Sequence, residues 1–142
     1  MTFYAIEPEV AGGFGERTKI IHNVGRPMTV THLHYQFDGW LGDELLASTP
    51  CFIVSKHLAD ELEGARLSGF SLDEVDISTS PEFRDLKGNV TLPRFLWLKV
   101  QGRANVDDFG LGERLRLVVS ERAFRVLEGK ISHAASVVAL PD

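Results

Sequence analysis

The segment FIVSKHLADELEG, residues 52–64, aligns without gaps on LVVSERAFRVLEG, residues 117–129. In each segment a short apolar run ends at a serine, and Leu-Glu-Gly begins seven residues after that serine. An unbroken apolar run of this length is typical of a buried strand, and a serine after it is a favourable helix N-cap. Glycine after the last apolar position favours the end of the helix. We therefore predict two similar strand–helix–strand units.

The rest of the chain adds strands to these two units. Apolar and polar residues alternate over residues 30–37, 70–78 and 95–100, which is the period of a half-buried strand. The resulting order mixes isolated strands with strand–helix–strand segments. We predict an α+β fold in a single domain, residues 1–142, with a mixed β-sheet on which the two similar units pack.

Composition fits a small cytoplasmic protein. The chain has 142 residues, of which 44% are hydrophobic and 25% are charged, as in ordinary globular domains. Its one cysteine, Cys51, rules out an intramolecular disulfide and suits a reducing compartment. The first residues lack the basic and apolar regions of a signal peptide, and no run is long enough to span a membrane. We expect a cytoplasmic protein with no membrane partner.

The net charge of −5 is distributed unevenly along the chain. Residues 58–85 hold eight acids and two arginines, a balance of −6, whereas residues 86–130 hold nine bases and five acids, a balance of +4. An acidic surface attracts a basic protein and repels nucleic acid. Six of these acids are the predicted recognition residues: Asp60, Glu61, Glu63, Asp73, Glu74 and Asp76.

Trp40 is the predicted aromatic anchor of the same partner site. It lies between two turn sequences, Asp38-Gly39 and Gly42-Asp43, where a tryptophan is either a lid over the core or an anchor in a partner's pocket. Both interpretations stay open at this stage.

Candidate catalytic groups are sparse. His32 and His34 share one face of the strand predicted over residues 30–37 and could both reach one zinc ion, although no third ligand is evident. Asp107 and Asp108 are adjacent carboxylates in a polar loop, where we expect them to be solvated and to have ordinary pKa values. The glycine-rich stretch at residues 12–15 lacks a phosphate-loop ending. We predict no catalytic residue, no metal and no cofactor.

One family resemblance covers most of the chain. It is carried by EPEVAGG (7–13), FDGWLGD (37–43), the FIVS helix start (52–55), WLKV (97–100), DDFGL (107–111) and LVVSERA (117–123). With these segments the chain resembles the immunity proteins of bacterial polymorphic toxin systems. The resemblance implies a non-enzymatic cytoplasmic inhibitor that binds one cognate toxin; it implies no particular site residue.

Three functions therefore remain at this stage. The first is an immunity protein that neutralises a basic toxin through its acidic surface. The second is a metal-dependent hydrolase that uses His32 and His34. The third is a homo-oligomeric structural module that pairs through an exposed sheet edge.

Overall fold

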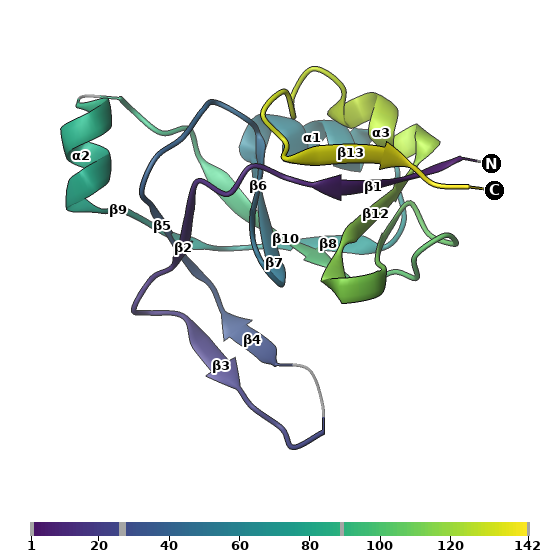
Figure 1. Cartoon of the computed structure of the whole chain (residues 1–142), viewed down its shortest axis with the longest axis horizontal. Coiled ribbons are helices and arrows are strands. Elements are labelled where there is room, and N and C mark those ends of the chain that lie inside the picture. Colours follow the sequence, from purple (N-terminus) through teal and green to yellow (C-terminus); the bar gives the residue numbers. More distant parts are fainter. Residues whose placement is uncertain (1, 26–27, 89, 142) are drawn as a thin grey trace.

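A computed structural model describes residues 2–25, 28–88 and 90–141. Within these ranges the chain forms thirteen strands and three α-helices, which confirms the predicted mixture of the two element types. The strands are divided among four separate sheets (Figure 1), so the prediction of one mixed sheet is wrong. Only three pairs of consecutive strands in the described ranges are hydrogen-bonded to each other: residues 19–21 with 29–32, 45–48 with 51–55, and 109–111 with 117–120. Elsewhere the next strand joins a different sheet or a non-adjacent position in the same sheet.

The central sheet has the strand order β6-β7-β10-β8, and all its neighbours are antiparallel. Its strands are β6 (Leu45–Ser48), β7 (Cys51–Ser55), β8 (Phe70–Asp73) and β10 (Phe95–Val100). Because β7 and β8 both pair with β10 in the antiparallel sense, they run parallel to each other with β10 between them.

A second four-stranded sheet has the order β11-β12-β1-β13. Its strands are β1 (Phe3–Glu7), β11 (Phe109–Leu111), β12 (Leu117–Ser120) and β13 (Ser136–Ala139). Here β12 and β13 both pair antiparallel with β1, so the first strand of the chain is inserted between two strands from its end. The two termini consequently lie side by side (Figure 1).

The remaining strands form a three-stranded sheet and a hairpin. The three-stranded sheet, of order β2-β5-β9, contains β2 (Gly12–Phe14), β5 (His34–Phe37) and β9 (Asp76–Thr79), with β5 and β9 parallel. The hairpin contains β3 (Lys19–Ile21) and β4 (Thr29–His32) and projects away from the rest of the chain (Figure 1).

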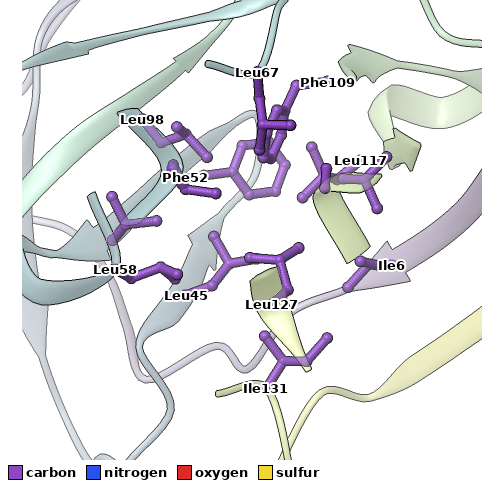
Figure 2. Close-up of a cluster of buried hydrophobic side chains, with 14 of the residues drawn as sticks. Ile6, Leu45, Phe52, Leu58, Leu67, Leu98, Phe109, Leu117, Leu127 and Ile131 are labelled. Atoms are coloured by element: carbon purple, nitrogen blue, oxygen red, sulfur yellow. The ribbon is translucent and has the colours of Figure 1, made fainter. Parts of the chain in front are cut away.

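The central sheet separates two hydrophobic cores. On one face, Phe52 and Val54 of β7 pack in a core with the helices over residues 56–64 and 121–127 and with the β1-containing sheet (Figure 2). On the other face, Cys51 and Ile53 pack with Tyr35, Phe37 and Trp97 against the β5-containing sheet. All five residues of β7 are buried because both of its faces are covered.

The helices begin where the sequence places serine caps. α1 (Lys56–Gly64) starts after Ser55, whose hydroxyl accepts a hydrogen bond from the Leu58 amide, and α3 (Glu121–Leu127) starts after Ser120, which accepts from the Ala123 amide. These two caps are confirmed. A seven-residue helix, α2 (Pro81–Lys87), and a short 3₁₀ helix, η1 (Glu113–Leu115), complete the elements.

Two predicted strands are each divided in the structure. Residues 30–37 break at Leu33 between β4 and β5, because β4 pairs with the hairpin strand β3 whereas β5 pairs with β2 and β9. Residues 70–78 break after Asp73, whose carboxylate accepts a hydrogen bond from the Glu74 amide and turns the chain. β8 and β9 consequently join different sheets.

Candidate functional site

A groove of about 570 Å³ lies where two loops and a helix end meet. Its walls include Val10 from the β1–β2 loop, Trp40 and Leu41 from the β5–β6 loop, and Leu86 from α2. Val10, Leu41 and Leu86 are 67%, 61% and 75% exposed, unusually high for large apolar side chains that lie together. We call this feature the Trp40 groove.

Trp40 is held in place by the core beneath it. Its ring meets Phe37 and Phe95 edge-on, at centroid separations of 6.5 and 6.1 Å, and its indole N–H donates to the Asp43 carbonyl at 2.9 Å. Trp40 is half-buried and lines the groove. The side chain therefore covers the core and at the same time offers a fixed apolar surface to the groove.

Two buried carboxylates fix the loop that carries Trp40. Glu9 accepts hydrogen bonds from the amides of Leu41, at 2.7 Å, and Asp43, at 3.3 Å. Asp43 in turn accepts from the His133 amide at 2.8 Å and contacts His133 Nδ1 at 2.9 Å. This network ties the β5–β6 loop to segments at both ends of the chain, so the groove wall is preorganised.

The same network brings three possible metal ligands together: Glu9, Asp43 and His133. Their ligand atoms all lie within 4.8 Å of one another, and within the described ranges this is the one group of three or more such residues that is close enough to share a metal ion. Sequence spacing does not reveal the group, because its members are 34 and 90 residues apart. Each carboxylate oxygen already has a hydrogen-bond partner. The observed bonds make this group a staple between loops.

Three of the predicted recognition acids lie on α1. Asp60 pairs with Lys56 at 2.5 Å, and Glu61 pairs with His57 and Lys130, both at 3.2 Å. Glu63 is exposed near the end of the helix. The structure brings these acids onto one helix but also gives two of them local cations.

The other three acids lie at or between the ends of β8 and β9 and are paired with basic side chains from distant segments. Their pairs are Asp73 with Lys99 at 2.9 Å, Glu74 with Arg94 at 3.2 Å, and Asp76 with His32 at 2.6 Å and Arg17 at 3.4 Å. These partners lower the pKa of Asp73 and of Asp76. The negative charge counted along residues 58–85 is therefore partly neutralised by basic side chains from other segments. Trp40, the predicted anchor, lines the Trp40 groove, whose lining contains none of the six predicted acids.

His32 and His34, the predicted metal pair, are engaged separately. His32 Nε2 contacts Asp76 at 2.6 Å, while His34 is buried and contacts Ser78 Oγ through Nε2 at 2.7 Å. The Arg17 amide lies 3.1 Å from His34 Nδ1 and can only donate. The Arg17 guanidinium lies 3.4 Å from His34 Nε2 and can likewise only donate, so each ring nitrogen faces a donor from Arg17.

The contacts of His34 limit what it can do. Its Nδ1 accepts from the Arg17 amide, and its Nε2 is shared between Ser78 Oγ and the Arg17 guanidinium, so neither nitrogen is placed to serve Ser78 alone as a base. Burial, and then the nearby Arg17 guanidinium, lower the pKa of His34 and keep it neutral. The contact between His34 and Ser78 stabilises the pairing of β5 with β9.

Asp108 is not the solvated carboxylate that the sequence suggested. Ser120 Oγ donates to it at 2.6 Å, Arg122 contacts it at 2.9 Å, and the Ser68 amide donates at 2.8 Å. Burial alone would raise the pKa of Asp108, but the bonds from Arg122 and Ser120 outweigh this effect and lower it. Asp108 therefore joins its loop to the start of α3 and has the bonds of a structural residue.

Comparisons with protein-family models, curated proteins and solved structures each gave no match. In the described ranges, no helix has the length and apolar character needed to cross a membrane.

Proposed function

We propose that this chain is a non-enzymatic binding protein whose partner is another protein, held in the Trp40 groove. The more specific form of this proposal is an immunity protein that neutralises one bacterial toxin in the cytoplasm. The main support for the proposal is that Val10, Leu41 and Leu86 converge on one groove beside the fixed Trp40 ring. Apolar anchors around a rigid aromatic side chain are typical of the central part of a protein interface.

The expected occupant is a segment with an apolar side chain flanked by basic residues. The groove has Glu9 and Asp38 in its lining against one cation, Lys87, and the chain as a whole has a net charge of −5. Such a surface accelerates association with a basic partner. The predicted acids Asp60, Glu61, Glu63, Asp73, Glu74 and Asp76 contribute to this long-range attraction, while the groove supplies the apolar contact.

The hydrolase interpretation has weaker support. A zinc site at His32 and His34 would need imidazole nitrogens that Asp76, Ser78 and the Arg17 amide already engage. Binding is the better interpretation because Val10, Leu41 and Leu86 offer exposed apolar surface in the groove, whereas the two imidazoles are already engaged.

The two similar segments support a scaffold role within this proposal. We regard β7–α1–β8 and β12–α3–β13 as copies of one strand–helix–strand unit. In both, the two strands of the unit are separated by a strand from another part of the chain, β10 in the first unit and β1 in the second. The groove lies outside both units, on loops and on α2. In this view the repeated units provide stability and the segments outside them provide recognition.

Co-expression tests the proposal. The products of the genes that flank this chain's own gene are expressed one at a time in a bacterial host, with and without this protein. We expect one product to stop growth and this protein to restore it. Leu86→Glu places a charge in the groove and should abolish the rescue, whereas Val106→Glu, at a valine that is 66% exposed and not among the groove residues, should preserve it.

The two parts of the proposal fail in different ways. If no flanking product is toxic, or if the protein gives no protection, the immunity role is refuted. If protection survives Leu86→Glu and also Val10→Glu, the protein is an inhibitor that does not use the Trp40 groove. Circular dichroism of each variant establishes that a loss of rescue does not result from unfolding.

A further inference from the structure

β13 (Ser136–Ala139) is the last strand of its sheet, and one of its edges carries no neighbour among the described strands. The Leu140 amide donates to the Phe3 carbonyl at 2.8 Å, so the amides of the alternate residues Val138 and Ser136 also point toward β1. The amides and carbonyls of Val137 and Ala139 then point away from the sheet. This edge therefore presents a short row of backbone groups that can pair with another strand.

Side chains do not protect this edge. Residues 134–141, AASVVALP, contain no charged residue, and Val137 and Val138 are 41% and 47% exposed. Native edge strands are ordinarily blocked by lysine or proline, by an inward-pointing charge or by a covering segment, and Pro141 lies two residues beyond β13. β13 has none of these features within the strand itself.

The other edges of the two four-stranded sheets, at β11, β6 and β8, do carry such features. The edge of β11 forms a bridge between Leu111 and Arg103, and β6 is bridged at Leu46 by Glu9. β8 ends at Asp73, next to Glu74. An assembly formed through β13 would therefore close after two copies, because the opposite edge of the same sheet is covered.

We propose that two copies of this chain associate through β13, forming one antiparallel pair about a two-fold axis at Val138. The outward-pointing backbone groups set this register. Val137 of one copy exchanges hydrogen bonds with Ala139 of the second copy, and Ala139 of the first copy does so with Val137 of the second. Val138 then faces Val138 of the second copy at a position without hydrogen bonds, where Cα atoms lie about 4.5 Å apart. The result is a continuous eight-stranded sheet.

The register also pairs suitable side chains. Val138 shares a sheet face with Ala5 and Val118, since Ala5 is the cross-strand neighbour of both. Ala5 and Val118 are 2% and 4% exposed. Pairing at the axis extends this apolar strip across both copies, and β-branched side chains favour such cross-strand contacts. The Trp40 groove lies on other elements, so the dimer and the proposed partner site are independent (Figure 1).

A cysteine scan tests the register directly. Val138→Cys places two thiols opposite each other at a separation that a disulfide spans, so mild oxidation should give a covalent dimer on a non-reducing gel. Val137→Cys, at the neighbouring exposed valine, is the matched control and should stay uncrosslinked, because its partner is Ala139. The native Cys51 does not interfere, since it is buried and burial raises its thiol pKa to about 11.

Solution mass tests the association itself. Light scattering of the wild-type chain should give twice 15.8 kDa. Val138→Lys places two like charges next to each other at the two-fold axis and should raise the dissociation constant of the dimer at least about tenfold. Val10→Lys, at an exposed valine in the Trp40 groove, should leave the dissociation constant of the dimer unchanged.

Three results would overturn the proposal. A wild-type chain that stays monomeric up to millimolar concentration would mean that the edge is unused or accepts a strand from a different protein. A dimer that Val138→Lys does not weaken would use another surface. Equal crosslinking of Val137→Cys and Val138→Cys would contradict the two-fold axis at Val138.

Discussion

Ser120 Oγ donates a hydrogen bond to Asp108 Oδ1 at 2.6 Å while also capping α3. The same relationship occurs at the start of α1, where Ser55 Oγ donates to Glu44 Oε1 at 2.6 Å. In both places the residue two positions after the serine supplies a basic group to that acid: His57 in the first and Arg122 in the second. Each serine thus joins its helix to the residue just before the antiparallel partner that precedes its own strand, since Glu44 precedes β6 and Asp108 precedes β11.

Removing the Ser120 hydroxyl should destabilise the protein through both contacts. Ser120→Ala loses the N-cap and deprives the partly buried Asp108 of one donor, so we expect the free energy of unfolding to fall by about 1–2 kcal/mol. Ser120→Thr keeps a hydroxyl and should recover most of that loss. Urea denaturation followed by circular dichroism measures both values, and equal stability of the two variants would contradict the dual role.

The two basic partners predict different pH dependence. The hydrogen bond and charge of Glu44, followed by Glu61, raise the pKa of His57 above 6.5. Its stabilising contribution is therefore complete below the unfolded pKa and is lost as pH rises through the higher folded pKa. His57→Ala should lower the melting temperature at pH 6 and have little effect at pH 9.

Arg122→Ala provides the control for this titration. Asp108 raises the pKa of Arg122, which stays charged throughout this pH range. The cost of Arg122→Ala should therefore be the same at pH 6 and pH 9 in thermal denaturation. A cost of His57→Ala that does not decrease with pH would show that the His57 charge does not stabilise the fold.

Truncation of two helical leucines should reduce the free energy of unfolding by very different amounts. Leu127 of α3 is fully buried in the core of Figure 2, whereas Leu86 of α2 is 75% exposed in the Trp40 groove. Leu127→Ala should cost about 2–5 kcal/mol of unfolding free energy, and Leu86→Ala less than about 0.5 kcal/mol. A large stability loss for Leu86→Ala would remove the argument that this side chain is kept exposed for binding.

Adjacent glycines in β2 form another matched pair. A Cβ atom at Gly12 would overlap the Gln36 carbonyl of β5, whereas a Cβ atom at Gly13 meets no neighbour within 4 Å. Gly12→Ala should destabilise by about 1–3 kcal/mol, and Gly13→Ala should be neutral or slightly stabilising. Chemical denaturation of the two variants compares them, and equal effects would contradict the close approach of β2 to β5.

Local patterns predicted the helices better than the sheets. Ser55 and Ser120 were identified as caps because a cap depends on residues within one helical turn, which the sequence places together. The same holds for the buried positions Leu58 and Leu62 of α1. The sheets depend on which strand edges meet, and a strand pattern such as residues 30–37 contains no information on its partners.

The site was predictable only in part, and the reason is again distance along the chain. Trp40 was identified from the turns on either side, but the exposure of Leu41 and Leu86 depends on how separate loops converge. Lys99, Arg94 and Arg17 reach the predicted acids from outside residues 58–85, so a linear count of charge overstated the acidic surface. Side-chain pairing across a fold is set by tertiary contacts.

By itself, the sequence determined the units that need only near neighbours: the buried strand β7, the two serine-capped helices and an interior thiol at Cys51. Only the tertiary structure decided the four sheets, the Glu9–Asp43–His133 staple, the groove beside Trp40 and the open edge of β13. Caps and periodic faces follow from contacts within a few residues. Sheets, grooves and edges arise from hydrogen bonds and packing between residues far apart in the chain, which no local pattern specifies.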